Sequence, residues 1–248
     1  MQQLAVAARE LGLPLRPEHI PVFRHYYQVL VEWNERFNLT AVTEYEQVQV
    51  RHFADSLTCL LATPALLEAA RQGTSCRLID VGSGAGLPGI PIKIVWPQVS
   101  LTMVESVAKK CSFLEHLATT LDLDDCTVLN RRAEDVGQDL AHRERYDVVV
   151  ARAVADLAEL AEYCLPLARR QGIVIAQKGA DVHGEVVQAE WAISLLGGSV
   201  DRVLQVEVPG TALPRSLVVI RKVALTPPQY PRRTGVPGRR PLLRPQPG

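Results

Sequence analysis

Three glycines stand at alternate positions directly after an apolar run that has the length of a β-strand. The run covers residues 78–81, and Gly82, Gly84 and Gly86 follow it. Glycine reaches positive φ easily and lets a ligand approach the backbone closely, because it has no Cβ. A strand that ends in such a turn is typical of a ligand site at the carboxyl edge of an α/β sheet. We therefore expect all three glycines to contact a cofactor.

Two cofactor classes use such a loop, and the charge beside it separates them. Gly84, Gly86 and Gly89 match the G-x-G-x-x-G pattern of dinucleotide sites, where a helix N-terminus faces a diphosphate. Asp80, at the end of the strand, would repel a diphosphate but could accept hydrogen bonds from a cationic ligand. S-adenosylmethionine carries a sulfonium and an ammonium group and no phosphate. The sequence therefore favours S-adenosylmethionine, and a nicotinamide-dependent oxidoreductase is the alternative.

Polar residues also follow the next two strands. Glu105 comes about where a ribose-binding carboxylate is expected, and Ser106 after it would cap the next helix or touch the adenosine. After the third strand, Glu134 or a neighbouring backbone amide would read the exocyclic amine of adenine. The alternative for both acids is a surface carboxylate that caps a helix.

The end of the fourth strand lacks two known catalytic devices. Residues 148–153 carry no Asp or Asn followed by Pro-Pro and an aromatic residue, as amine methylation would need, and the chain has no Pro-Cys for methylation of cytosine C5. Guanine N7 has a free lone pair in the ring plane, so its methylation requires alignment and no general base. We therefore expect no catalytic acid–base pair. Arg152 would orient the methionine carboxylate or guanine O6, or else contact a phosphate or remain a surface charge.

The elements that position these residues belong to an α/β fold. From residue 77 onward, apolar runs of strand length alternate with helical runs, which predicts a doubly wound parallel sheet. The strands are expected at 78–81, 101–104, 127–129, 148–151, 173–176, 203–208 and 217–220, and the main helices at 107–121, 156–169 and 184–196. A short loop joins the last two strands, so this pair should be antiparallel. A seven-stranded, mostly parallel, Rossmann-like sheet of the class I methyltransferase kind results.

Two further segments flank this unit. Residues 1–72 show a helical period and predict a small N-terminal helical subdomain, including a helix at 48–61. Residues 73–225 form the expected cofactor-binding domain. Residues 226–248 hold seven of the 17 prolines and are expected to be neither helix nor central strand. From Arg221 onward there are seven basic residues and no acidic one in a chain of zero formal net charge, which indicates a polyanionic partner at one edge.

Composition sets the remaining expectations. No apolar run approaches the roughly 20 residues that span a bilayer, and the first residues lack the order of a signal peptide. The five cysteines are scattered and never spaced as C-x-x-C, so we expect buried thiols, no disulfide framework and no metal site. We expect a cytoplasmic monomer without membrane contact.

The sequence resembles the RsmG family, also called GidB, of small-subunit ribosomal RNA guanine-N7 methyltransferases. The matching segments are Trp33-Asn34, Asn38-Leu39-Thr40, Arg51-His52, Asp55-Ser56-Leu57, Asp80 through Pro91, Ala133-Glu134, Ala151-Arg152-Ala153, Tyr230 through Gly235, and Pro237. Their order across nearly the whole chain is specific, whereas the glycine loop alone is not.

The resemblance implies transfer of a methyl group from S-adenosylmethionine to N7 of one guanine in the decoding-region loop of 16S rRNA, on naked RNA or on the small ribosomal subunit. It implies cofactor contacts at Gly82, Leu87, Ala133, Glu134 and Arg152, although many relatives carry Phe where this chain has Leu87. It also suggests a phosphate-binding arm that contains Arg232, Arg233, Arg239 and Arg240. A non-catalytic RNA-binding protein is the second alternative.

Overall fold

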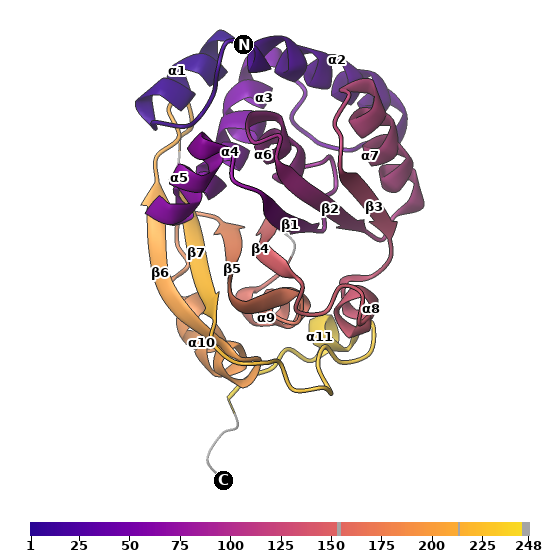
Figure 1. Ribbon diagram of the computed structural model, residues 1–248, viewed down its shortest axis with the longest axis vertical. Coiled ribbons are helices and arrows are strands. Elements are labelled where there is room, and N and C mark those ends of the chain that lie inside the picture. Colours follow the sequence, from indigo (N-terminus) through magenta and orange to yellow (C-terminus); the bar gives the residue numbers. More distant parts are fainter. Residues whose placement is uncertain (153–154, 213, 245–248) are drawn as a thin grey trace.

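A seven-stranded sheet forms the centre of the protein, whose computed structural model describes residues 1–152, 155–212 and 214–244 (Figure 1). The strands are β1 (Cys76–Val81), β2 (Val99–Glu105), β3 (Cys126–Asn130), β4 (Tyr146–Arg152), β5 (Ala168–Lys178), β6 (Gly198–Val206) and β7 (Arg215–Lys222). Their order in the sheet is β3-β2-β1-β4-β5-β7-β6. The pairs among β1 to β5 are parallel, and β7 is antiparallel to both β5 and β6. The predicted fold class is confirmed; β6 begins and ends earlier than the expected 203–208.

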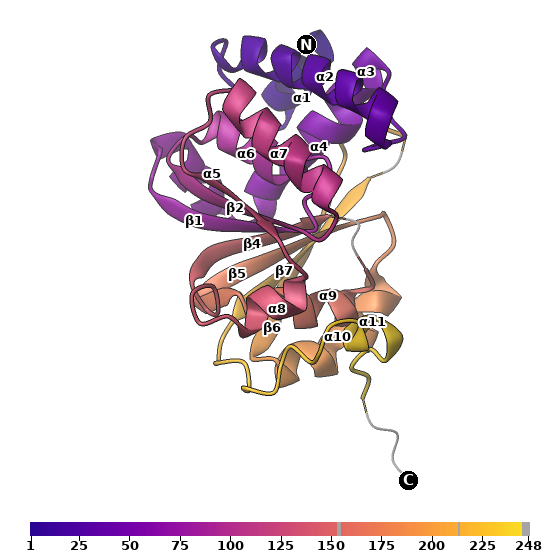
Figure 2. The same ribbon diagram turned by 90° about the vertical axis from the view of Figure 1, so that its right-hand side faces the viewer.

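Helices cover both faces of the sheet, as Figure 2 shows. One face carries α1 (Gln2–Glu10), α2 (His19–Phe37), α3 (Tyr45–Val48), α4 (Asp55–Leu57), α5 (Pro64–Gln72), α6 (Gly89–Val95) and α7 (Ala108–Thr120). The other face carries α8 (Ala133–Gln138), α9 (Leu157–Cys164), α10 (His183–Leu195) and α11 (Val236–Arg239). The polar residues that follow the parallel strands therefore meet at one sheet edge between two helical layers.

Two helix predictions need correction. The expected helix at 48–61 is one helical segment of mixed geometry, in which a π-helical stretch at Gln49–Ala54 and a 3-10 stretch at Thr58–Ala62 flank α4. The expected helix at 156–169 ends at Cys164. Leu165 still has helical backbone, and Pro166 after it has no N–H with which to continue the helical hydrogen bonds.

The N-terminal helices share one hydrophobic core with the sheet. Leu4, Phe23 and Leu57 belong to the same buried cluster as Leu78 and Leu101 of the first two strands. This core crosses residue 72, so the division into parts at 1–72, 73–225 and 226–248 stays a prediction. Among the described residues no single helix is long and apolar enough to cross a membrane; one bent pair, Tyr45–Ala62 with Pro64–Gln72 at 112°, has the length and composition.

The C-terminal segment contradicts the expectation that it contains no helix. Residues 236–239 form the single turn α11, with a proline in its first positions, where the missing N–H costs nothing. We call residues 226–242 the C-terminal strap, because this segment runs over α8 and α9 (Figure 2). The last four residues, 245–248, lie outside the described part of the chain.

Candidate functional site

The glycine loop lies at the carboxyl end of β1, as the sequence predicts. Gly82, Gly84 and Gly86 have φ values of 75°, 55° and 84°, in the left-handed region that glycine favours. A Cβ on Gly86 would lie 2.9 Å from Ile90 Cγ1 and 3.0 Å from Tyr26 Oη, so this position must be glycine for α6 and α2 to pack. A Cβ on Gly84 would meet nothing closer than the Gly82 carbonyl oxygen at 3.8 Å. The Gly84 side of the loop is therefore the side left open to a ligand.

Asp80 holds this loop from below. Its side chain has no exposed surface, and Oδ2 accepts a hydrogen bond from the Gly89 backbone N–H at 3.0 Å. Oδ1 is buried, and no described residue forms a hydrogen bond with it. Burial raises the pKa of the Asp80 carboxyl to about 7, although the Gly89 hydrogen bond opposes this. The structure gives Asp80 a role in shaping the loop, and its direct contact with a cofactor stays a prediction.

Glu105 links the ends of β1 and β2. One carboxylate oxygen accepts from the Gly84 N–H at 3.1 Å and the other from the Val107 N–H at 2.8 Å. Each oxygen keeps a free lone pair for a ligand hydroxyl, because a carboxylate oxygen can accept two hydrogen bonds. Ser106 lies beside Glu105 but does not cap α7, whose N-cap residue is Val107.

A small hollow of about 100 Å³ opens between this loop and α8. Residues from both regions line it: Val81, Gly82, Val104, Glu105, Ser106, Arg131, Arg132, Ala133, Glu134 and Tyr163. The hollow thus brings together most of the predicted adenosine contacts from three strand ends. Glu134 is 4% exposed, and its Oε1 accepts from the Gly235 N–H of the C-terminal strap at 2.8 Å. The Glu134 carboxylate is therefore partly engaged by the strap. Leu87 does not line the hollow; it is buried in the core.

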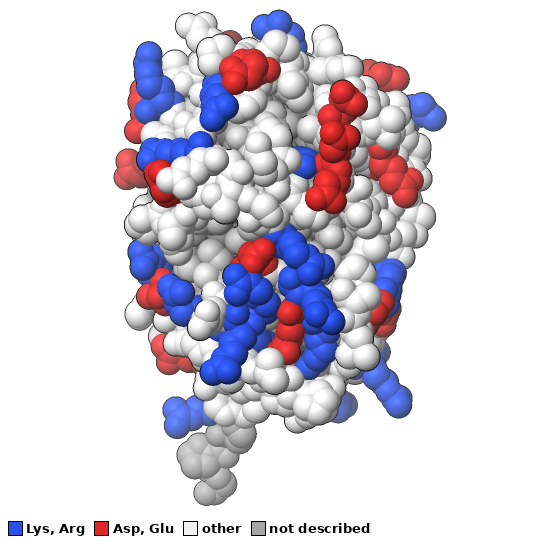
Figure 3. All heavy atoms as spheres, in the orientation of Figure 1, with Lys and Arg blue, Asp and Glu red and all other residues white. Residues whose placement is uncertain are grey.

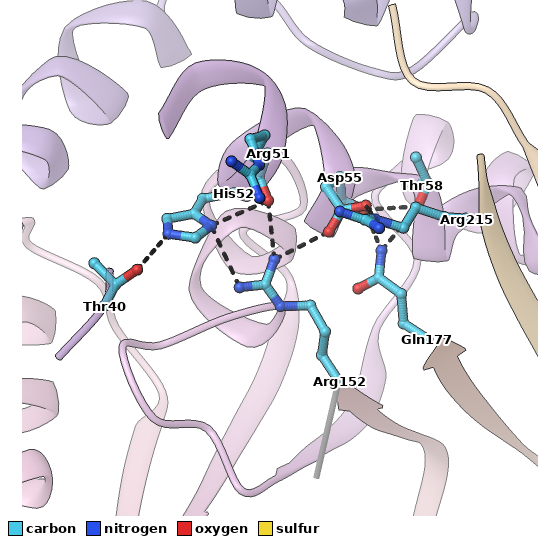
Figure 4. A network of polar contacts seen from close by, with 8 residues as sticks. All are labelled: Thr40, Arg51, His52, Asp55, Thr58, Arg152, Gln177 and Arg215. Atoms are coloured by element: carbon cyan, nitrogen blue, oxygen red, sulfur yellow. Dashed lines mark hydrogen bonds and ion pairs between the residues drawn. The ribbon is translucent and has the colours of Figure 1, made fainter. Parts of the chain in front are cut away.

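Arg152 lies in a second cavity, of about 300 Å³, at the same sheet edge (Figure 4). Val42, Arg51, His52, Asp55, Arg152, Gln177, Lys178, Gly179 and Arg215 line this acceptor-side cavity. Two guanidinium groups donate hydrogen bonds to one carboxylate here. Arg152 Nη1 donates to Asp55 Oδ2 and Arg215 Nε donates to Asp55 Oδ1, each at 3.0 Å. The helical segment 45–62 therefore supplies the carboxylate, and β4 and β7 supply the cations.

Two ionisable groups in this cavity have shifted pKa values. Burial and the neighbouring Arg152 charge lower the pKa of His52 to about 4, so its imidazole is neutral near pH 7. His52 Nε2 lies 2.8 Å from Thr40 Oγ1. Burial raises the pKa of the Asp55 carboxyl, against the opposing effect of its two arginine partners. His52 therefore does not provide a general base with a pKa near 7. This suits a reaction that needs no general base.

Three polar residues of this cavity, Gln177, Lys178 and Arg215, are not among the residues that the sequence patterns predict for the site. Arg215 binds the Asp55 carboxylate, while Gln177 and Lys178 end β5. Gln177 donates from Nε2 to the Asp55 carbonyl oxygen at 2.6 Å, and its Oε1 is buried without a partner among the described residues. The signal was present, because Gln177 and Lys178 directly follow the predicted strand 173–176. Arg215 precedes the predicted strand 217–220, and an antiparallel strand begins at the edge where its neighbours end.

The four arginines of the C-terminal strap lie in different environments. Arg232 makes a bidentate ion pair with Glu162, whose side chain is fully buried, and its Nη2 lies 2.6 Å from Glu162 Oε2. It also donates to the Arg240 carbonyl oxygen. Arg233, Arg239 and Arg240 are exposed. The structure thus uses the charge of Arg232 inside the fold, whereas the charges of the other three face solvent.

The remaining predictions concern Ala153, the cysteines and metal binding. Ala153 of the matched segment lies outside the described residues. All five cysteines are free thiols, and four are buried. No cluster of three or more His, Cys, Asp or Glu residues in the described ranges could hold a metal ion.

Comparison with known proteins places this geometry in a family. The family model described as rRNA small subunit methyltransferase G matches residues 19–213. The "Ribosomal RNA small subunit methyltransferase G" of Roseiflexus sp. (strain RS-1) is 52% identical over 98% of this chain and 100% of that protein. The protein of the same name from Pelotomaculum thermopropionicum is 49% identical over 95% of each chain. A ribosomal protein L11 methylase from Lactobacillus delbrueckii subsp. bulgaricus shares the fold, with a TM-score of 0.51 and 14% identity over 70% of this chain and 79% of that one. The chain belongs to the rRNA small subunit methyltransferase G family.

Proposed function

We propose that this protein transfers the methyl group of S-adenosylmethionine to N7 of a guanine in 16S rRNA. The observation that carries the proposal is the pairing of two sites on one sheet edge. The hollow beside Gly82 and Glu105 lies at the ends of β1 and β2, and the acceptor-side cavity lies at the end of β4, the strand next to β1. The names of the relatives support rRNA as the substrate.

The residues present fit the proposed cofactor. The open face of Gly84 gives backbone access, and Glu105 keeps lone pairs for ribose hydroxyls. The hollow of about 100 Å³ is smaller than the roughly 300 Å³ or more of usual small-molecule sites, so we expect its polar walls, Arg131 or Arg132 among them, to move outward when the cofactor binds. When bound, S-adenosylmethionine supplies an electrophilic methyl group on a sulfonium.

The acceptor-side cavity would hold the guanine. Its arginines and Lys178 are donors suited to the O6 acceptor of guanine. Gln177 Oε1, which has no partner among the residues that the structure describes, is an acceptor suited to the N–H groups of the same base. Guanine N7 would supply the attacking lone pair and the bound cofactor would leave as the neutral thioether, so the cavity would need to move no proton. The chain's residues would contribute by alignment, which fits the neutral His52 and the absence of any nominated base.

The exposed arginines of the strap would bind phosphates at this edge. Arg233 and Arg239 flank Gly235, which lies against Glu134 at the hollow, so their charges stand beside the proposed cofactor site. Long-range attraction of this kind steers a polyanion toward the site and weakens with salt.

The test is transfer of labelled methyl groups from S-adenosylmethionine to unmodified small-subunit RNA, followed by digestion to nucleosides and mass spectrometry. Label in 7-methylguanosine is the expected result. Label in another nucleoside would keep the cofactor and overturn the target atom. Binding of NADH in place of S-adenosylmethionine would favour the oxidoreductase, and cofactor binding without transfer to any RNA would favour a non-catalytic RNA-binding protein.

A further inference from the structure

Six arginines gather at the opposite edge of the sheet, where the parallel strands begin. They come from, or directly precede, neighbouring strands of the sheet: Arg77, Arg145, Arg169, Arg170, Arg202 and Arg221. We call this group the amino-edge patch. All six are exposed, and Figure 3 shows basic side chains concentrated at the centre of this face.

Carboxylates neutralise only part of this charge. Asp147 pairs with Arg169, and Asp201 pairs with both Arg202 and Arg221. The nearby Glu144 is engaged by Lys222 at 3.3 Å and by the Thr226 backbone N–H. In the described part of the chain, the side chains of Arg77, Arg145 and Arg170 form no ion pair, and the Arg77 guanidinium lies over the Tyr146 ring. A chain of zero formal net charge therefore concentrates a positive surplus on this face.

A groove lies beside the amino-edge patch. Its volume is about 560 Å³, and Asp147, Gln171, Arg202 and Arg221 form its polar wall. The two aspartates hold three of the arginines in fixed positions, which lowers the entropy lost when they bind a ligand. Arginine presents a planar fork of donors that matches phosphate oxygens better than an ammonium does. These features favour an extended phosphate backbone as the ligand.

The patch cannot serve the acceptor nucleotide itself. Arg145 precedes β4 and Arg152 ends it, and a strand of seven residues at about 3.3 Å per residue puts roughly 20 Å of folded protein between them. We propose that the amino-edge patch is a second rRNA-binding surface, which holds the backbone of a segment separate from the one that presents the guanine. The inference rests on the proposed function. It adds that the enzyme recognises a large folded RNA that reaches both edges of its sheet.

The test compares two RNAs and two matched variants. Arg145→Glu with Arg170→Glu reverses two of the three patch charges that have no ion pair, and Arg9→Glu with Arg24→Glu makes the same change in net charge on the exposed surfaces of α1 and α2. The substrates are whole unmodified 16S rRNA and a short hairpin that carries only the target loop. Binding is measured against salt concentration, methylation as KM and kcat, and folding as Tm.

For the patch variant we expect KM for whole 16S rRNA to rise about tenfold and the slope of log Kd against log salt to fall by about 2. Its kcat, its affinity for S-adenosylmethionine and its behaviour on the hairpin should match those of the control variant. If Tm falls, Arg145→Gln with Arg170→Gln replaces it, with the same changes expected at smaller size.

Equal losses on both RNAs, or an unchanged salt slope on whole 16S rRNA, would overturn the second surface while leaving the proposed function intact. Conversely, the unaltered protein could form no 7-methylguanosine while the patch variant still showed a weaker dependence of RNA binding on salt. This result would contradict the proposed function and support the second RNA-binding surface.

Discussion

Asp55 determines the geometry of the acceptor-side cavity at the scale of single residues. Its carboxylate binds Arg152 and Arg215, and its carbonyl oxygen accepts from Gln177 (Figure 4). Three side chains from β4, β5 and β7 thus converge on one residue of the helical segment 45–62. Because this carboxylate is 3% exposed, its charge is compensated almost entirely by the two guanidinium groups.

Replacing Asp55 with Asn should therefore weaken both stability and catalysis. The change leaves two arginines without their carboxylate, so we expect a loss of about 3 kcal/mol in the free energy of unfolding. A decrease in kcat/KM of about 100-fold should accompany it, because a small misplacement of a positioning group is costly. Denaturant titration and methylation kinetics measure the two effects. Wild-type kinetics in a destabilised Asp55→Asn variant would show that the cavity does not hold the acceptor.

Asp80 makes stability depend on pH. Its pKa is raised from 3.8 to about 7 in the folded protein, so between these values the native state holds a proton that the unfolded chain has lost. Its contribution to stability is therefore fully present below about pH 4, declines as pH rises toward 7, and is absent above that. The slope reaches at most about 1.4 kcal/mol per pH unit.

The Asp80→Asn variant isolates this effect, because Asn does not titrate. The difference in unfolding free energy, wild type minus variant, should decrease between pH 5 and pH 7 and stay constant above pH 7.5. Urea titrations at several pH values measure it. A difference that is constant across the whole range would contradict the raised pKa.

At the scale of elements, the C-terminal strap holds α8 and α9 beside the cofactor hollow. It contacts α8 through Gln138 Nε2, which donates to the Pro231 carbonyl oxygen, and through Gly235, which donates to Glu134. Arg232 fixes it to α9 through the buried Glu162. Since α8 and α9 supply Glu134 and Tyr163 to the cofactor hollow, the strap supports one wall of that hollow.

Arg232 and Arg233 should therefore differ sharply although they are neighbours. Arg232→Gln leaves Glu162 buried without its cation, so we expect a loss of roughly 2 kcal/mol and a fall in Tm of roughly 4–8 °C. The Kd for S-adenosylmethionine should rise about tenfold, because the α8 wall loosens. Arg233→Gln should leave Tm and this Kd unchanged and flatten only the salt dependence of RNA binding. Calorimetry and RNA-binding titrations separate the two.

A double variant provides the control. Glu162→Gln combined with Arg232→Gln removes both charges and should recover part of the lost stability, since no unpaired charge remains buried. If Arg232→Gln instead behaves like Arg233→Gln, the strap does not support the cofactor hollow.

At the scale of the whole molecule, the N-terminal helices and the sheet share one hydrophobic cluster. Buried residues of α1, α2 and the helical segment 45–62 belong to one cluster with residues of β1 and β2. Removing the N-terminal helices would expose the apolar face of the sheet that they cover (Figure 2). The functional edge is built across the same boundary, because Asp55 meets Arg152 and Arg215.

We therefore expect thermal unfolding in one cooperative transition. Scanning calorimetry should give a calorimetric enthalpy equal to the van't Hoff enthalpy, and far-ultraviolet circular dichroism should report the same midpoint as tryptophan fluorescence. Trp33 lies in α2 and Trp191 in α10, so the fluorescence samples both helical layers. Two resolved transitions would support an independent unit at 1–72.

Local patterns explain why so much of the fold could be predicted. Each strand is a short apolar run followed by a polar or glycine-rich turn, and this alternation specifies strand, helix and the shared carboxyl edge without further information. The glycine loop and Glu105 can be found because each directly follows such a run, and Glu134 because it comes a few residues after the run at 127–129. The helical turn 236–239 was missed because four residues with one proline carry no period, and its formation depends on the surface under it.

The sequence by itself determined the α/β fold, the cofactor loop and the family resemblance, since these depend on residue types at short spacings along the chain. Only the tertiary structure decided which charges are free. Arg232 and Arg233 are indistinguishable in the sequence. In the fold, Arg232 forms an ion pair with Glu162, which lies 70 positions away, whereas Arg233 is exposed. Arg77 and Arg221 are far apart in the chain, yet the sheet brings their strands' ends to one edge. Pairing across such separations depends on how strands are ordered and packed, and no local pattern of residues encodes it.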